Sequence, residues 1–287
     1  MPTAPLHDGT RVAYQIHGSG PTVLLPVDPV PKEGAAAGEL RRWGGMDPAL
    51  GRALAEGLGD AFQVVAFDYE GHRMRHPAAA LTPTHLAADL LAVADAAGAG
   101  RFAYYGYSWL ALAGLQLALR TDRLTALAMG GFPPLGGPYA QMLRVTAAAH
   151  TMALRPRTPA AGPERDTPSG GGEEYDWSGV QIAADGAQTG QFLGLYQALE
   201  GFDEAAAQCL VDCPRLCFAG SADVIPYGPE WGGVTVDMAG PLTRERARLE
   251  AAGWQVRVLD GLDHTGAMQP GAVLPVLRPW LAAAHAD

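Results

Sequence analysis

Short apolar runs alternate with amphipathic segments along most of the chain. Runs at residues 22–27 (TVLLPV), 63–68 (QVVAFD), 102–107 (FAYYGY), 124–129 and 215–219 are nearly free of polar residues, which is typical of strands buried on both faces. Segments 48–58, 85–97 and 109–120 carry apolar residues at helical spacing or are rich in Ala and Leu, so we predict helices there. Strands and helices in alternation predict a parallel sheet with right-handed crossovers.

Both ends of the chain extend this pattern. Residues 11–17 (RVAYQIH) alternate polar and apolar positions after an Asp8-Gly9 turn signal, so they predict a strand that leaves a hairpin. Residues 255–259 alternate in the same way, which predicts a strand near the edge of the sheet. Helices are expected over 242–252 and 271–284.

The segment from 134 to 208 breaks the alternation. It contains a predicted helix at 139–154, a polar stretch rich in Pro and Gly at 155–172, and a second predicted helix at 191–210. We interpret it as an insertion that covers the strand ends as a cap, with residues 1–133 and 209–287 forming the core domain. The alternative is an ordinary pair of helices on the sheet joined by a long loop.

Composition excludes several classes of protein. Of the 287 residues, 48% are hydrophobic, which is far from the composition of a disordered chain. A net charge of −10 with only 20 Lys and Arg argues against a nucleic-acid surface. The first 15 residues show no apolar signal region, and no run has the character of a membrane span. We therefore expect a cytoplasmic protein with a small-molecule substrate, and the sequence leaves its oligomeric state, including a homodimer, open.

The three cysteines do not indicate a metal or redox site. Cys209 and Cys213 are one helical turn apart and Cys217 falls in a predicted strand, but no His lies nearby and the spacing is not C-x-x-C. We expect free, buried thiols in a reducing compartment and no metal or other cofactor.

Ser108 lies at the most informative position in the sequence. It falls where the predicted strand 102–107 meets the predicted helix 109–120, within Gly106-Tyr107-Ser108-Trp109-Leu110. A Ser at a sharp strand-to-helix turn presents its hydroxyl at the end of a sheet and at a helix N-terminus, as in a nucleophile elbow. The small Gly106 suits the strained turn, whereas Leu110 stands where the pattern has Gly.

A serine hydroxyl needs a base to take its proton. Three histidines follow Ser108 in the sequence: His150 in the expected cap, His285 at the C-terminus and His264 after the edge strand. Since the order Ser, acid, His is expected for this elbow, His264 is our candidate base.

The acid that orients the base is expected at the same edge of the sheet. Asp223 follows the strand 215–219 through a Gly-Ser-Ala turn and is the candidate, with a role in capping the turn as the alternative. Asp263 adjoins His264 in sequence, and such neighbours seldom face each other. Asp260 is a weaker substitute.

An oxyanion hole requires two backbone N–H donors aimed at one point. Trp109, the first residue of the predicted helix, supplies one candidate donor. Asp28 supplies the other, because Pro29 and Pro31 in the same loop have no N–H. A carboxylate beside a developing negative charge would repel it unless the side chain points away or is protonated.

Taken together, these motifs resemble those of the α/β-hydrolase fold over nearly the whole chain. The resemblance is carried by GYSWL at 106–110, GSADVIP at 220–226, DHTG at 263–266 and FDYEGH at 67–72. It implies an eight-stranded, mostly parallel sheet with helices on both faces, a helical cap, and a triad of Ser108, Asp223 and His264. The chain departs from the family pattern at Pro26-Val27, Leu110 and Glu70, and we expect the last of these to be structural.

Three functions are compatible with this sequence. The first is a hydrolase that acts through an acyl-enzyme on a small, largely apolar carboxylic ester, thioester or lactone. The second is non-ester chemistry on the same fold, as a C–C hydrolase, lyase or isomerase. The third is a catalytically silent protein that binds a small ligand. Reaction of Ser108 with a serine-directed probe distinguishes the first from the others.

Overall fold

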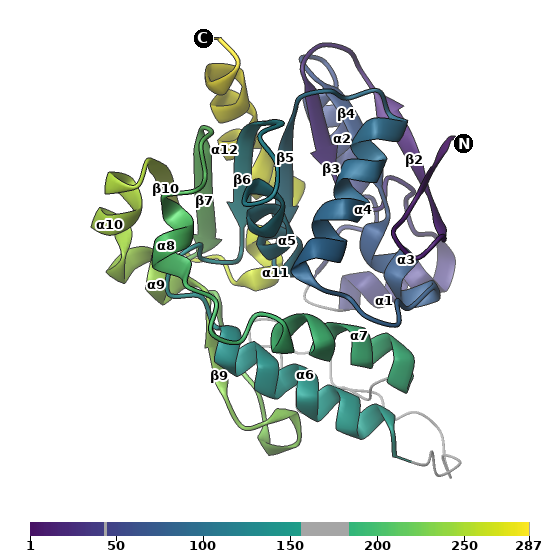
Figure 1. Cartoon of the computed structure of the whole chain (residues 1–287), viewed down its shortest axis with the longest axis vertical. Coiled ribbons are helices and arrows are strands. Elements are labelled where there is room, and N and C mark those ends of the chain that lie inside the picture. The colour runs from purple at the N-terminus through teal and green to yellow at the C-terminus, as the bar shows by residue number, and fades with distance from the viewer. Residues whose placement is uncertain (43–44, 156–183, 287) are drawn as a thin grey trace.

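The structure, a computed structural model, describes residues 1–42, 45–155 and 184–286 around one central sheet (Figure 1). The sheet has eight strands in the order β1-β2-β4-β3-β5-β6-β7-β10. β1 and β2 pair antiparallel with their neighbours, and all the other pairs are parallel. The bounds are β1 Thr3–Pro5, β2 Arg11–His17, β3 Thr22–Leu25, β4 Gln63–Phe67, β5 Phe102–Tyr107, β6 Leu124–Gly130, β7 Arg215–Gly220 and β10 Trp254–Leu259. The predicted mostly parallel eight-stranded sheet is confirmed.

Helices cover both faces of this sheet. One face packs against α4 (Pro83–Ala96) and α5 (Trp109–Ala118), and the other against α2 (Leu50–Leu58) and α12 (Pro270–Ala284). Successive side chains of β5 point to opposite faces of the sheet. Tyr104 packs on the side of α4 and α5, and Tyr105 packs on the side of α2 and α12. Both side chains are almost fully buried, as the unbroken apolar sequence of this strand predicts.

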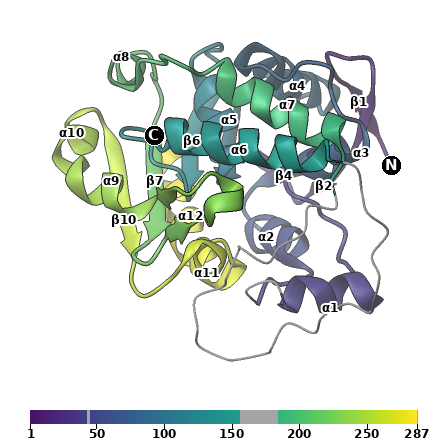
Figure 2. The ribbon, with the colours of Figure 1, turned by 90° about the horizontal axis from the view of Figure 1, so that it is seen from below.

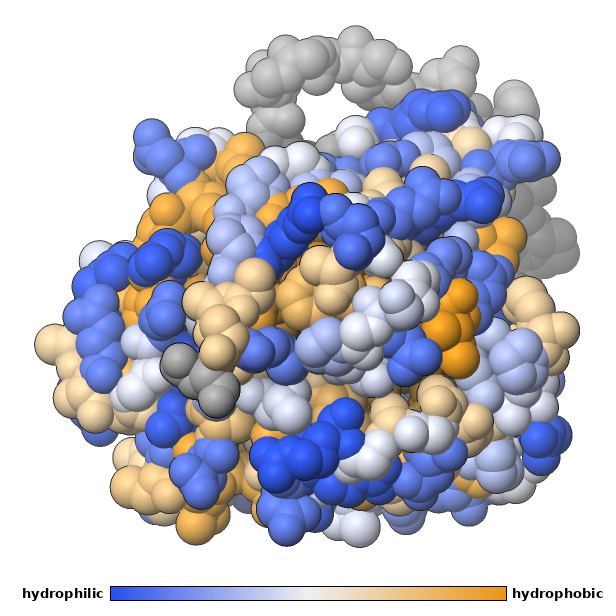
Figure 3. All heavy atoms as spheres, turned by 90° about the horizontal axis from the view of Figure 1, so that it is seen from above, coloured by the Kyte–Doolittle hydropathy of each residue, from blue (hydrophilic) through white to orange (hydrophobic). Residues whose placement is uncertain are grey.

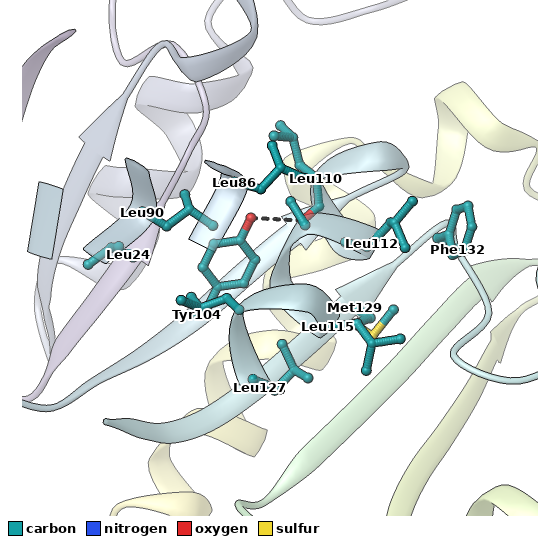
Figure 4. Close-up of a cluster of buried hydrophobic side chains, with 14 of the residues drawn as sticks. Leu24, Leu86, Leu90, Tyr104, Leu110, Leu112, Leu115, Leu127, Met129 and Phe132 are labelled. Atoms are coloured by element: carbon teal, nitrogen blue, oxygen red, sulfur yellow. Dashed lines mark hydrogen bonds between the residues drawn. The ribbon is translucent and has the colours of Figure 1, made fainter. Parts of the chain in front are cut away.

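The contact between β5 and α5 is unusually close. A Cβ on Gly114 of α5 would lie 2.4 Å from the Tyr104 ring, so only glycine permits this approach. The Tyr104 hydroxyl donates a 2.7 Å hydrogen bond to the carbonyl of Leu110, and leucines of α4 and α5 surround the ring (Figure 4). This packing fixes the start of α5 against the end of β5, where Ser108 lies.

Two predicted helices are each split in two. The helix expected at 191–210 is instead two helices, α7 (Gly186–Gln197) and α8 (Glu204–Gln208). Gly201 takes a positive φ of 75° between them. The Asp203 carboxylate then begins α8 as its N-cap by accepting a hydrogen bond from the amide of Ala206. The helix expected at 242–252 is α9 (Ala239–Arg244) and α10 (Arg246–Ala251). Apolar periodicity continued across both breaks, so it did not reveal them.

α6 (Tyr139–Ala153) and α7 lie side by side across the carboxyl ends of the parallel strands (Figures 1 and 2). Gln191 of α7 fastens them to the core, since its amide donates to Arg73 O at 2.9 Å and accepts from Ala78 N at 3.2 Å. Residues 156–172 of the polar stretch noted in the sequence lie outside the described residues. The two helices therefore lie over the strand ends.

The remaining elements surround the same edge of the sheet. They are α1 (Gly34–Arg42), α3 (Tyr69–Arg75), α11 (His264–Ala267), the 3-10 turn Pro229–Trp231, and an unpredicted hairpin of β8 (Val224–Pro226) and β9 (Thr235–Asp237). None of the described helices combines the length and apolar character that crossing a bilayer requires. The face opposite α6 and α7 shows hydrophilic and hydrophobic residues interspersed (Figure 3).

The three thiols are free, but only one is buried. Cys217 lies within the sheet, whereas Cys213 is half-buried and Cys209 is exposed. The prediction of buried thiols is therefore wrong for two of the three. Since α8 ends at Gln208, Cys209 and Cys213 do not lie on one helix face either.

Candidate active site

Ser108 occupies a strained turn between β5 and α5. Its φ of 56° is the only positive φ at a non-glycine position among the described residues, and its ψ is −129°. The Ser108 amide donates a 2.8 Å hydrogen bond to Gly130 O at the end of β6, which holds the turn. A polar residue kept in such a backbone conformation at a helix N-terminus is what the elbow motif predicts.

Gly106 makes this turn sterically possible. A Cβ at this position would lie 2.3 Å from the backbone oxygen of Leu110. The atoms of Leu110 nearest to Gly106 are its backbone carbonyl atoms, while the residue as a whole is 6% exposed and belongs to the core cluster. The leucine at the second glycine position of the motif therefore does not obstruct the turn.

Asp223 and His264 are paired. The imidazole Nδ1 of His264 lies 2.8 Å from Oδ2 and 3.0 Å from Oδ1 of Asp223. Asp223 has no exposed surface, and its carbonyl accepts from the amides of Met238 and Ala239 at 3.0 and 3.3 Å. A buried carboxylate on Nδ1 fixes the ring and assigns the proton to that nitrogen, which leaves Nε2 free to act as a base.

The other carboxylates near His264 have different partners or none. Asp263 caps α11 by accepting from Gly266 N at 2.6 Å, and His264 is the first residue of that helix rather than part of a loop. Asp260 makes no hydrogen bond or ion pair with the described residues. Asp223 is the carboxylate that reaches the imidazole.

The other two histidines that follow Ser108 are bonded elsewhere. His150 of α6 contacts Thr189 of α7 at 3.0 Å. His285 contacts Thr125 at 3.0 Å, so it is held at the end of α12.

A cavity of about 470 Å³ joins these groups. Ser108, His264, Trp109 and Asp28 all line it, and most of its other wall residues are apolar. Ser108 and His264 are both half-buried there, and no hydrogen bond joins the Ser108 hydroxyl to the imidazole in the described structure. Such bonds are often long in free enzymes and shorten when substrate binds.

The wall of this cavity differs from the sequence-based expectation. Residues from 26–40 and 46–51, in α1, the start of α2 and the loops beside them, supply much of it, and none of its described lining residues belongs to α6 or α7. Phe192 of α7 packs edge-on against the Trp109 ring, with centroids 5.2 Å apart. In the described part of the chain, α7 thus meets the cavity through Trp109 rather than directly.

Both residues that carry the candidate oxyanion donors line this cavity. The amides of Trp109 and Asp28 make no hydrogen bond with described residues, so both remain available. The Asp28 carboxylate accepts from Val30 N at 2.9 Å and forms a close ion pair with Lys32. Lys32 therefore counters the negative charge that made Asp28 an unexpected residue at this position.

Two residues gain a place in the site that sequence patterns did not give them. Tyr107 donates from its hydroxyl to the backbone carbonyl of His264 at 2.8 Å. Glu70, which we expected to be structural, lines the cavity. The sequence marked Glu70 as a departure from the family pattern, but only the three-dimensional structure shows that this residue lines the cavity.

Comparison with known proteins identifies the fold. No protein-family model matches the sequence, and a comparison with curated proteins finds no match. Solved structures do match over nearly the full length.

Three of these structures illustrate the similarity. An esterase from Thermogutta terrifontis is 17% identical, with TM-score 0.60, covering 99% of this chain and 98% of that one. A carboxylesterase from Nitrososphaera gargenis is 18% identical, with TM-score 0.62 and full coverage of both chains. An epoxide hydrolase from Vigna radiata is 16% identical, with TM-score 0.54, covering 98% and 97%. The sheet order, the helices on both faces and these neighbours establish that the chain is an α/β-hydrolase-fold protein.

Proposed function

We propose that this protein is a serine hydrolase that acts through an acyl-enzyme on a small, largely apolar carboxylic ester, thioester or lactone. One observation carries the proposal: the buried Asp223 carboxylate holds Nδ1 of His264 in the cavity where Ser108 lies at a strained elbow. The apolar wall and the size of the cavity support the substrate class.

Each residue has a defined role in this mechanism. The Ser108 hydroxyl attacks the carbonyl carbon while Nε2 of His264 takes its proton, and Asp223 stabilises the imidazolium. The amides of Trp109 and Asp28 donate to the oxyanion. As the bond to the leaving oxygen or sulfur breaks, His264 gives the proton to that atom. Water then attacks the acyl-enzyme while His264 takes its proton, and the carboxylic acid is released as the proton returns to Ser108.

We also propose that residues 134–208 form a cap. Its support is the position of α6 and α7 across the strand ends and the contact of Phe192 with Trp109. Because Trp109 directly follows Ser108, a movement of the cap would change the packing of the residue next to the proposed nucleophile.

A fluorophosphonate probe tests the mechanism directly. We expect one covalent adduct on Ser108 in the unaltered protein, and none in Ser108→Ala or His264→Ala. His150→Ala is the matched control, since it removes a histidine that lies in α6 outside the cavity, and it should still be labelled. Hydrolysis of short-chain p-nitrophenyl esters should follow the same pattern.

Absence of labelling in the folded, unaltered protein would contradict the proposal. It would instead favour non-ester chemistry, such as C–C hydrolysis, or a protein that only binds a ligand. Circular dichroism of each variant separates loss of chemistry from loss of fold.

A further inference from the structure

Four carboxylates line the cavity, and they differ in their partners. Asp28 pairs with Lys32, Asp68 lies 3.0 Å from the Arg75 guanidinium, and Asp47 accepts from Ala49 N at 2.8 Å. Glu70 forms no ion pair with the described residues, and its polar neighbour is the neutral indole N–H of Trp109. It is therefore the acidic group of the wall that is left for a ligand.

The surroundings of Glu70 are those of a carboxylate that lacks a counter-charge. Enclosure by protein raises the pKa of its carboxyl group, and the neighbouring Asp68 adds to the rise. The side chain remains accessible, as expected for a group that faces a cavity rather than the packed core. An accessible carboxylate without a counter-charge attracts an arriving cation, and the cation in turn favours its ionised form.

Trp109 lies beside this carboxylate. The indole N–H of Trp109 opposes the rise of the Glu70 pKa, and it has no other hydrogen-bond partner among the described residues. Since Trp109 directly follows Ser108, Glu70 lies against the residue next to the candidate nucleophile. A group bound by Glu70 would therefore be close to the reacting carbonyl.

We propose that Glu70 binds a primary ammonium group on the substrate, so that the favoured substrates are small apolar esters, thioesters or lactones with an amine a few bonds from the scissile carbonyl. This inference rests on the proposed function. The apolar wall would hold the carbon chain, Glu70 the ammonium, and Ser108 the carbonyl. A neutral chain of the same shape would leave the Glu70 carboxylate desolvated and unpaired.

Two methyl esters of equal shape test the proposal. β-Alanine methyl ester carries an ammonium where methyl butyrate has a methyl group. We expect kcat/KM to favour the cationic ester by about tenfold or more, as for a partly buried charge pair. Glu70→Gln keeps the shape of the side chain and should lower this ratio about tenfold. The matched control is Glu56→Gln, the same change on the exposed surface of α2, which should leave the ratio unaltered.

Binding to Ser108→Ala separates this inference from the mechanism. We expect this variant to bind the cationic ester more tightly than methyl butyrate, by Trp fluorescence or calorimetry, and addition of Glu70→Gln should remove the difference. If neither ester is hydrolysed but the binding preference persists, the proposed function fails while the Glu70 site stands. A preference that is absent, or that survives Glu70→Gln, overturns the site.

The unaltered protein offers a readout that does not depend on folding of a variant. Propylammonium should compete with methyl butyrate, whereas 1-propanol at the same concentration should not. Equal inhibition by the two would also overturn the proposal, because it would show that charge is not recognised.

Discussion

The hydroxyl of Tyr107 donates a 2.8 Å hydrogen bond to the backbone carbonyl of His264, 157 positions later in the chain. The two rings also lie 5.1 Å apart. Tyr107 directly precedes Ser108, so this bond ties the candidate nucleophile's strand to the turn that carries the candidate base. The spacing between the candidate nucleophile and the candidate base therefore depends on Tyr107, which has no role in the proposed proton transfer.

Replacing Tyr107 by Phe tests this link. The change removes one buried hydrogen bond, so we expect about 1 kcal/mol less stability and a fall in kcat/KM of about fivefold. Ester hydrolysis and urea denaturation measure the two effects. Unchanged activity together with reduced stability would mean that the bond supports the fold but does not position His264.

Gly106→Ala should prevent formation of the elbow. Its new Cβ would lie 2.3 Å from Leu110 O and 2.5 Å from Leu110 C, and backbone atoms cannot move aside cheaply. We expect loss of fluorophosphonate labelling and a clearly lower thermal midpoint. Gly100→Ala is the matched control, because no atom lies within 4 Å of the added carbon and its φ is not positive. Retained labelling of Gly106→Ala would contradict the elbow geometry.

Asp223→Asn should reduce turnover far more than stability. The amide cannot hold the ring in the tautomer that leaves Nε2 free, and loss of this partner lowers kcat by about 10⁴-fold in a related triad. Single-turnover hydrolysis measures the chemical step. Because Asp263 lies beside His264 but caps α11, Asp263→Asn should lower kcat much less. Equal losses in the two variants would argue against Asp223 as the orienting acid.

Gln191→Ala should loosen α7. It leaves the buried Arg73 carbonyl and Ala78 amide without partners, which costs about 2 kcal/mol or more. Hydrogen exchange should accelerate in α7 while the central strands remain protected. Gln197→Ala, at an exposed position of the same helix, should leave exchange unchanged. Uniform acceleration across the protein would mean that α7 does not open separately from the core.

His72 should make stability depend on pH below neutrality. Burial first, and then Arg73 and His76, lower the pKa of His72 from 6.5 to about 4. Between pH 6.5 and 4, His72 is protonated in the unfolded chain but neutral in the folded protein. The free energy of unfolding therefore falls as the pH drops through this range. At pH 5 the loss amounts to about 2 kcal/mol.

Urea denaturation at pH 7.5 and pH 5 measures this effect. His72→Gln retains an amide that can bond to Thr10, the present partner of the ring at 2.9 Å, and should lose less stability between the two pH values. The depressed pKa of Asp8 acts in a different window, since its contribution is lost only as the pH falls below about 4. An equal loss in both proteins would assign the pH dependence to other groups.

Local patterns in the sequence predicted most of the scaffold. Apolar runs gave the strands of the sheet, and the change from strand to helix at Ser108 gave the elbow. The order of Ser108, Asp223 and His264, each at a strand end, was enough to name residues that lie at one edge of the sheet. Periodicity failed at 191–210 and 242–252, because one glycine turn or one residue outside helical geometry ends a helix without changing the apolar spacing.

The sequence by itself determined that strands, helices and an elbow would form, because these depend on residues only a few positions apart. Tertiary structure alone decided that residues from 26–40 and 46–51 line the cavity, that Tyr107 reaches His264, and that Glu70 has no ion-pair partner among the described residues. Whether a charged side chain is paired depends on which distant segments pack around it. The spacing of residues along the chain does not determine that packing, so the chemistry of the cavity wall could be read only from the three-dimensional structure.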